Sequence, residues 1–276
     1  MTNSVMRLAQ PLSVLLAPVL AYQGWRIKRN TPLLPEAEVR EGTVPGSGTP
    51  LRLLLVGDSL AAGVGVDHNE HALAGHLAAL LARQSGRPVT WQVMGKNGAT
   101  ARSAGKYLTS RAPDLLTGWS PDVAVVIVGI NDLIRFRRLE DWARTTAFLA
   151  HNVRRALADD ALVMFCGIPP VARFPALPQP LRTVMAIRAN LMDQRLKRTV
   201  EELGARHVPL PPEKVDETEQ PFFSRDRFHP SAYGYEVLAT AFSPVMAAWT
   251  ADREKAARPS PAAPRAEFLE SGAGDE

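Results

Sequence analysis

The sequence contains only one cysteine among its 276 residues. A chain with one cysteine forms no intramolecular disulfide and cannot supply several thiolates to a zinc or iron–sulfur site. This residue, Cys166, ends the apolar run 162–166, so we expect a buried and unreactive thiol. The composition is otherwise ordinary, with 46% hydrophobic and 22% charged residues. It therefore excludes disordered, collagen-like and disulfide-framework proteins.

A strong excess of one charge is also missing. The net charge is +4, from 32 basic and 28 acidic residues, and no block of five or more basic residues occurs. Proteins that bind nucleic acid usually concentrate basic residues in a patch or stripe. We therefore expect no nucleic-acid partner.

No apolar run reaches the roughly 20 residues that a helix needs to cross a bilayer. The apolar stretch 12–22 is interrupted by Pro18 and is followed by Trp25 and three basic residues. Three interpretations stay open: a secretory signal cleaved near residues 19–21, an interfacial membrane anchor, and a helix packed on the domain's own surface. We accordingly expect peripheral membrane contact through residues 8–29, and we favour a cytoplasmic or membrane-associated location over export.

Composition divides the chain into three parts. Residues 1–50 contain the apolar segment and, at 40–50, a linker rich in glycine and proline. Residues 51–250 form one folded domain. Residues 251–276, with three prolines and a small polar end, are predicted to be a disordered tail.

Within the central part, short apolar runs alternate with longer segments of helical periodicity. The runs have little polar alternation, which is typical of strands buried on both faces. The predicted strands are 51–56, 89–94, 123–128, 162–167 and, more weakly, 206–209; the predicted helices are 71–84, 101–116, 141–158, 181–203 and 232–250. This order predicts a doubly wound parallel sheet, in which ligands bind beyond the carboxyl ends of the strands.

Residues suited to chemistry follow three of these strands. The first strand leads into Gly-Asp-Ser-Leu at 57–60, and a serine in this place can hold its hydroxyl at the active edge of the sheet. The second leads to Gly98, where a backbone N–H can point at developing negative charge. The third leads to Gly-Ile-Asn-Asp at 129–132, where the Asn131 amide is a further donor. Taken singly, the serine and glycine motifs are more typical of ordinary turns, and the asparagine could simply cap the next helix.

Asp226 and His229 precede the last predicted helix at a spacing of three residues. This spacing lets the carboxylate accept a hydrogen bond from one imidazole nitrogen while the other nitrogen faces the cleft. Such a pair fixes the tautomer and stabilises the imidazolium, as a general base for a serine hydroxyl requires.

These four segments occur in one order and together resemble the signature blocks of the SGNH, or GDSL, hydrolase family. The resemblance extends from about residue 51 to 245. It implies a flavodoxin-like three-layer α/β/α sandwich with a five-stranded parallel sheet. It also implies ester hydrolysis without a metal or an organic cofactor.

The resemblance further implies a role for each residue. Ser59 would be the nucleophile, His229 the general base and Asp226 its orienting partner. The oxyanion hole would consist of the backbone N–H groups of Ser59 and Gly98 and the side-chain amide of Asn131. Nearby Gly95 is an alternative to Gly98.

The expected function is therefore that of a serine esterase acting on short- to medium-chain acyl esters of small molecules. A lysophospholipase or thioesterase and a carbohydrate acetyl esterase are alternatives within the same family. The proline-rich segment 168–178 could line an acyl pocket or pack on the helix that follows it.

Three rival interpretations lie outside the family. A small-anion-binding module could use the glycines after Ser59 at a helix N-terminus. Residues 57–61 nearly match the G-x-S-x-G elbow of α/β-hydrolases but lack its final glycine. His68 and Glu70 match half of a zinc-deaminase signature, whose cysteine pair is missing.

Overall fold

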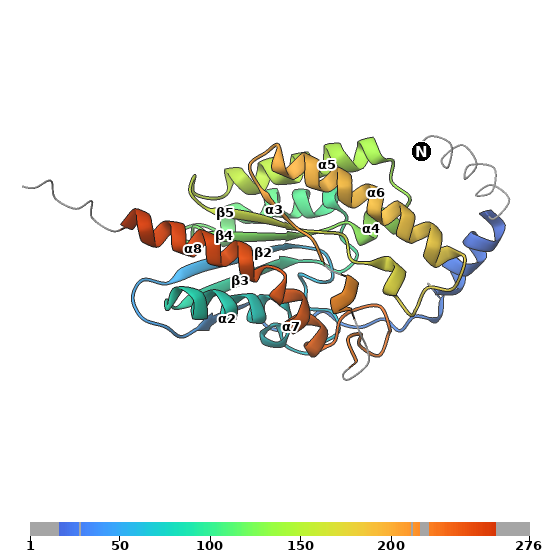
Figure 1. Cartoon of the computed structure of the whole chain (residues 1–276), viewed down its shortest axis with the longest axis horizontal. Helices are drawn as coiled ribbons and strands as arrows, with labels where there is room; N and C mark the ends of the chain where they lie inside the picture. The colour runs from blue at the N-terminus through green and yellow to red at the C-terminus, as the bar shows by residue number, and fades with distance from the viewer. Residues whose placement is uncertain (1–16, 28, 211, 216–220, 258–276) are drawn as a thin grey trace, which may run out of the picture.

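The computed structural model of the chain describes residues 17–27, 29–210, 212–215 and 221–257. These residues form a three-layer α/β/α sandwich around one sheet (Figure 1), which confirms the predicted fold class. The strand order is β1-β3-β2-β4-β5-β6. The strands are β1 (Glu41–Val44), β2 (Leu51–Gly57), β3 (Val89–Gly95), β4 (Val123–Ile127), β5 (Leu162–Cys166) and β6 (Arg206–Val208).

The centre of the sheet explains why the apolar runs predicted strands correctly. Every residue of β4 and β5 is buried, and in β2 only Arg52 is partly exposed. Strands covered by helices on both faces need apolar side chains at successive positions, because both faces of the pleat meet other layers. Strands β2 to β6 are all parallel to one another, so their carboxyl ends lie at one edge.

Helices cover the two faces in separate groups (Figure 1). On one face lie α2 (Leu73–Ser85), α7 (Ala232–Thr240) and α8 (Ser243–Ala257); on the other lie α3 (Ala101–Leu115), α5 (Leu139–Arg155) and α6 (Leu181–Glu201). A short helix, α4 (Ile130–Ile134), follows β4 directly. Three single-turn 3₁₀ helices are η1 (Asn69–His71), η2 (Val171–Arg173) and η3 (Pro212–Lys214).

The predicted linker at 40–50 is wrong in part, because it contains strand β1. This strand pairs antiparallel with β3 and makes the sheet six-stranded instead of five-stranded. Backbone pairing does not require an apolar run, and β1 alternates exposed and half-buried residues. Its Gly42 lies against the Trp91 ring, where an added Cβ would be 2.4 Å from a ring carbon. Gly42 is thus needed for the close approach of β1 to Trp91, although the glycine content of residues 40–50 suggested a linker.

The last predicted helix, 232–250, is in fact two helices, α7 and α8. Pro244 has no backbone N–H and its ring crowds the preceding turn, which disfavours a continuous helix through this position. In the first turn of a new helix the same residue is tolerated. Helix α8 continues to Ala257, so the predicted tail begins too early; residues 258–276 lie outside the described part.

The N-terminal apolar segment is helical at residues 17–27. Leu20 and Ile27 pack against the hydrophobic core, as expected for a helix lying on the domain's own surface. Residues 1–16 lie outside the described residues, so the open interpretations are untested for them. No helix in the described ranges is long and apolar enough to cross a membrane.

Candidate active site

Ser59 lies in the turn that follows β2. In the sheet, Gly57 is in register with Gly95 of β3 and Ile127 of β4. An added Cβ on Gly57 would lie 1.9 Å from the Ile127 carbonyl oxygen, so only glycine fits where β2 ends. The Asp58 carboxylate then accepts a hydrogen bond from the Leu60 N–H at 3.0 Å. This local contact shapes the turn that presents the Ser59 side chain.

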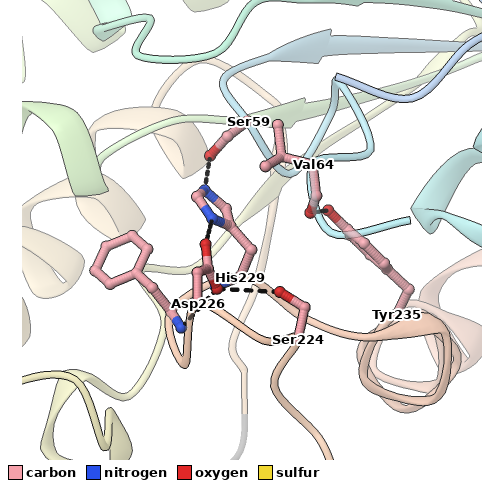
Figure 2. A network of polar contacts seen from close by, with 7 residues as sticks. Ser59, Val64, Ser224, Asp226, His229 and Tyr235 are labelled. Carbon is pink, nitrogen blue, oxygen red and sulfur yellow. Dashed lines mark hydrogen bonds and ion pairs between the residues drawn. The ribbon is translucent and has the colours of Figure 1, made fainter. Parts of the chain in front are cut away.

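Three side chains predicted from two separate motifs form one hydrogen-bonded chain (Figure 2). Asp226 Oδ2 lies 2.6 Å from His229 Nδ1. His229 Nε2 lies 3.0 Å from Ser59 Oγ. Since Nδ1–H donates to the carboxylate, Nε2 carries no proton and accepts a hydrogen bond from the Ser59 hydroxyl. The structure therefore brings together residues separated by 170 positions.

Asp226 is held by four donors. Its Oδ1 accepts hydrogen bonds from Ser224 Oγ at 3.0 Å and from the N–H groups of Phe228 and His229, both at 2.9 Å. Burial alone raises the pKa of Asp226, but the hydrogen bonds from the His229 ring, the His229 N–H and the Phe228 N–H outweigh burial. The net effect holds the pKa below its ordinary value of 3.8. The carboxylate thus stays charged opposite the imidazole.

The loops that carry Ser59 and His229 are joined to each other. Tyr235, on α7, donates its hydroxyl to the Val64 carbonyl at 2.8 Å (Figure 2), and the Val64 N–H donates to the Ser59 carbonyl at 3.0 Å. An added Cβ on Gly65 would lie 2.3 Å from the Pro230 carbonyl oxygen. No local sequence pattern indicates the contacts of Tyr235 with Val64 and of Gly65 with Pro230, because each joins residues more than 150 positions apart.

The predicted oxyanion donors lie around the same sheet edge. No acceptor for the backbone N–H of Ser59 or of Gly98 is found within the described residues. The Asn131 amide donates one hydrogen bond to the Ala99 carbonyl at 3.0 Å. The second N–H of the amide is not used in that bond. The alternative Gly95 belongs to β3, and an added Cβ there would lie 2.4 Å from the Ala62 nitrogen. Gly95 is therefore needed for packing against the turn after Ser59.

Two further buried carboxyl groups lie beside the site, and the sequence analysis assigned them no role. Asp58 and Asp132 are 1% and 2% exposed. Burial raises the pKa of Asp58 to about 7, partly offset by the Leu60 N–H and reinforced by the charge of Asp132. Burial also raises the pKa of Asp132, whose Oδ2 accepts a hydrogen bond from the Ala101 N–H at 2.9 Å. Both belong to the motifs at 57–60 and 129–132, which is the signal that could have identified them.

An apolar pocket opens at Ser59 and His229. Its volume is about 20 Å³, close to the roughly 10–15 Å³ that one water molecule requires. Apart from Ser59 and His229, the lining residues are apolar: Leu60, Ile130, Pro169, Pro170, Phe174, Val215, Phe222, Phe223, Phe228, Pro230 and Leu238. Three of them belong to segment 168–178, which therefore lines the pocket.

The aromatic residues of the pocket pack edge to face. The Phe174 ring lies 5.1 Å from Phe228 and 5.4 Å from Phe223, and the Phe228 ring lies 5.2 Å from the His229 ring. Such pairs add packing energy beyond the area they bury. The imidazole is thus held from the side by an aromatic wall as well as by Asp226.

The remaining candidates for chemistry lie elsewhere. Cys166 is buried in β5, and burial raises the pKa of its thiol well above the ordinary value, so the thiol stays protonated. In the described part of the chain, no group of three or more histidine, cysteine, aspartate or glutamate side chains is arranged to hold a metal ion.

Comparison with known proteins agrees with the family resemblance found in the sequence. Residues 55–237 match the GDSL-like Lipase/Acylhydrolase family. The chain is 29% identical over 192 residues to a GDSL-like esterase of Mycobacterium tuberculosis; the alignment spans 68% of this chain and 59% of that protein. The chain thus covers less than two thirds of the length of that relative.

Solved structures show the same fold at lower identity. A lipase/acylhydrolase from Enterococcus faecalis superposes with a TM-score of 0.55 and 20% identity, covering 72% of this chain and 96% of that one. An acetylxylan esterase from Geobacillus stearothermophilus superposes with a TM-score of 0.52 and 19% identity, covering 73% and 95%.

Proposed function

This chain belongs to the GDSL-like lipase/acylhydrolase family, and from that premise we propose that it is a serine esterase. It hydrolyses short-chain carboxylic esters of small molecules through an acyl-enzyme. The observation that carries the proposal is the continuous hydrogen-bond chain from Ser59 through His229 to Asp226. The Ser59 end of these hydrogen bonds lies at the mouth of an apolar pocket.

In the first step, His229 Nε2 removes the proton of Ser59 as Oγ attacks the ester carbonyl carbon. The tetrahedral intermediate carries a negative oxygen, and the imidazolium is stabilised by Asp226. When the intermediate collapses, the bond to the alcohol oxygen breaks and His229 donates its proton to that oxygen. The alcohol leaves and the acyl group stays on Ser59.

In the second step, water takes the place of the alcohol. His229 accepts a proton from the water as the water oxygen attacks the acyl carbon, and it returns the proton to Ser59 Oγ as the acid leaves. One ester and one water give one acid and one alcohol. The neutral imidazole is restored, so no external reductant, oxidant or cofactor enters the balance.

The developing oxyanion is stabilised by three donors in this proposal: the backbone N–H groups of Ser59 and Gly98 and the amide of Asn131. The two backbone groups have no acceptor in the described chain, so they are available to the substrate oxygen. Donors that are already oriented act without reorganisation cost during the reaction.

The small pocket supports a short acyl group. A cavity of about 20 Å³ accommodates few atoms beyond the carbonyl carbon unless its phenylalanine walls move. Its lining has no charged side chain, as an acyl methyl or ethyl group requires.

A fluorophosphonate probe tests the proposal, because it reacts covalently with an activated serine. The full chain should gain the mass of one probe, and peptide mapping should locate the probe on Ser59. Ser59→Ala should not react and should lower kcat on p-nitrophenyl acetate by about 10⁴–10⁶-fold.

Ser110→Ala is a matched control, since Ser110 is an exposed serine on α3. This variant should react with the probe as the parent chain does. An unlabelled parent chain, or a Ser59→Ala variant with full turnover, would contradict the proposal and favour the anion-binding module.

A further inference from the structure

The whole positive excess of this protein lies near its N-terminus. The first 35 residues contain four basic residues and no acidic one, whereas the remaining residues contain 28 of each charge. The four are Arg7, Arg26, Lys28 and Arg29. The net charge of +4 is thus concentrated in one short segment.

Part of this segment forms the helix at residues 17–27, which has two different sides. Leu20, Gln23 and Ile27 follow helical spacing and are partly buried against the domain. The residues at the opposite helical angles, Tyr22 and Trp25, are 58% and 55% exposed. The helix is therefore attached by one side and leaves an aromatic side uncovered.

The exposed residues form a compact group. The Tyr22 and Trp25 rings stack with centroids 6.1 Å apart, and the Arg29 guanidinium lies over the Trp25 ring at 5.4 Å. Arg26, next to Trp25 in the chain, is also exposed. We call Tyr22, Trp25, Arg26 and Arg29 the aromatic–basic face.

We propose that the aromatic–basic face docks on the surface of an anionic lipid bilayer. Tyrosine and tryptophan prefer the headgroup region, because their rings are apolar and carry one polar group. Arginine side chains attract phosphate and other anionic headgroups, and no acidic residue within the first 35 opposes this attraction. The protein is then membrane-associated without spanning the bilayer. This goes beyond the proposed esterase activity and does not depend on it.

The helix is also attached near the pocket. Gln23 donates a hydrogen bond to the Gln179 carbonyl at 2.7 Å and accepts one from the Leu181 N–H at 3.2 Å. These residues directly follow segment 168–178, which lines the pocket. Figure 1 shows the helix (blue) beyond the N-terminal end of α6, on the side of the molecule where α4 follows β4. Docking would thus bring the pocket loop close to the lipid surface.

Vesicle flotation of the full chain tests the inference, and it requires no catalysis. The protein should float with phosphatidylcholine vesicles that contain 30% phosphatidylglycerol, and much less with pure phosphatidylcholine. Raising the salt concentration should weaken binding, because exposed charges are screened.

Two double variants distinguish the electrostatic contribution of the arginines to vesicle binding from the apolar contribution of the aromatic rings. Arg26→Gln with Arg29→Gln should weaken binding to anionic vesicles by about fivefold for each arginine removed. Tyr22→Ala with Trp25→Ala should weaken it by at least roughly tenfold, from the lost apolar burial. All variants should keep the turnover of a soluble ester.

The control variants remove two exposed positive charges, or one exposed aromatic ring, elsewhere on the domain. Arg83→Gln with Arg102→Gln changes two exposed arginines on α2 and α3, and Phe148→Ala removes an aromatic ring that is 51% exposed on α5. Both should bind vesicles as the parent chain does. Failure of the parent chain to bind anionic vesicles at low salt overturns the inference. Equal binding by the variants at 22, 25, 26 and 29 also overturns it, as would a change of oligomeric state without vesicle binding.

Discussion

At the scale of single residues, Asn131 combines a structural and a proposed chemical role. One N–H of its amide is bound to the Ala99 carbonyl, which fixes the orientation of the side chain beside the sheet edge. The other N–H is then directed by the planar geometry of the amide. A donor held in this way costs little entropy when the oxyanion forms.

Asn131→Ala should lower kcat on p-nitrophenyl acetate by about 10²–10³-fold, with a much smaller change in KM. Steady-state kinetics measure both quantities. Asn190→Ala, an exposed asparagine on α6, is the control and should keep parental kinetics. A kcat within about twofold of the parent would exclude Asn131 from the oxyanion hole.

The raised pKa of Asp58 predicts that the stability of the protein depends on pH. Its pKa is about 7 in the folded chain against 3.8 ordinarily, so the folded state binds the proton more tightly than the unfolded state. The stability that this proton contributes is fully present below about pH 3.8 and is lost as the pH rises through 7.

Asp58→Asn has no carboxylate to ionise. Relative to the parent, its free energy of unfolding should therefore rise between pH 4 and pH 8, by at most about 4 kcal/mol. Urea unfolding across this range measures the difference. Asp159→Asn, an exposed aspartate, should show no such trend, and a pH-independent difference for Asp58→Asn would contradict the prediction.

At the scale of elements, helix α7 holds the turn after β2 through Tyr235. Both Tyr235 and Val64 are fully buried, so the Val64 carbonyl has no access to water if the hydroxyl is removed. Tyr235→Phe should lower the free energy of unfolding by about 1–3 kcal/mol and slow labelling of Ser59 by the fluorophosphonate probe.

Tyr233→Phe is the matched control on the same helix, because this tyrosine is 37% exposed. Chemical denaturation and labelling rates should not change in this variant. If Tyr235→Phe were as stable and as reactive as Tyr233→Phe, the hydroxyl would have no part in positioning Ser59.

Gly65 brings the loop that carries Ser59 into close contact with the loop that carries His229. Its φ of +113° is strained for other residues, and a Cβ there would lie 2.3 Å from the Pro230 carbonyl oxygen. Gly65→Ala should push the loop with His229 away from Ser59 and lower kcat by about 10²-fold.

Gly204→Ala distinguishes the effect of backbone strain at a positive φ from the effect of a steric clash with another loop. Gly204 also has a positive φ, +74°, but nothing lies within 4 Å of an added Cβ. This variant should lose only about 1 kcal/mol of stability and keep its kcat. Equal kinetics for the two alanine variants would refute the loop-contact argument.

At the scale of the whole molecule, the pocket is assembled from four distant parts of the chain. The turn after β2, helix α4, segment 168–178 and the stretch from Val215 to Leu238 each contribute lining residues. The size of the pocket is therefore a property of the packed domain, and no single motif determines it.

The volume of about 20 Å³ predicts a preference for p-nitrophenyl acetate over the octanoate ester, on the order of tenfold or more in kcat/KM. Phe174→Ala removes a wall of the pocket and should shift the preference toward octanoate. Phe148→Ala, outside the pocket, should keep the parental profile. A parent chain that prefers octanoate would contradict the short-chain proposal.

The sequence by itself determined the central strands and most of the helices. Strands β2, β4 and β5 are continuous apolar runs, and such local patterns depend only on residues close together in the chain. The order of the motifs likewise indicated which hydroxyl, imidazole and carboxylate to examine. That Ser59 would lie at the carboxyl edge of the sheet followed from the parallel topology, since it directly follows a strand. That Asp226 and His229 would meet Ser59 there was implied by the resemblance to the family, because neither residue directly follows a strand.

Only the tertiary structure decided the features that depend on contact between distant residues. Strand β1 pairs through its backbone, with Gly42 fitted against Trp91, although its sequence is typical of a linker. The contact between Tyr235 and Val64, the carboxylate of Asp132 at the start of α3, and the narrow pocket have no local pattern either. Each depends on which surfaces meet when the layers pack. That is fixed by the sum of many weak contacts across the whole domain and not by the preference of any short segment.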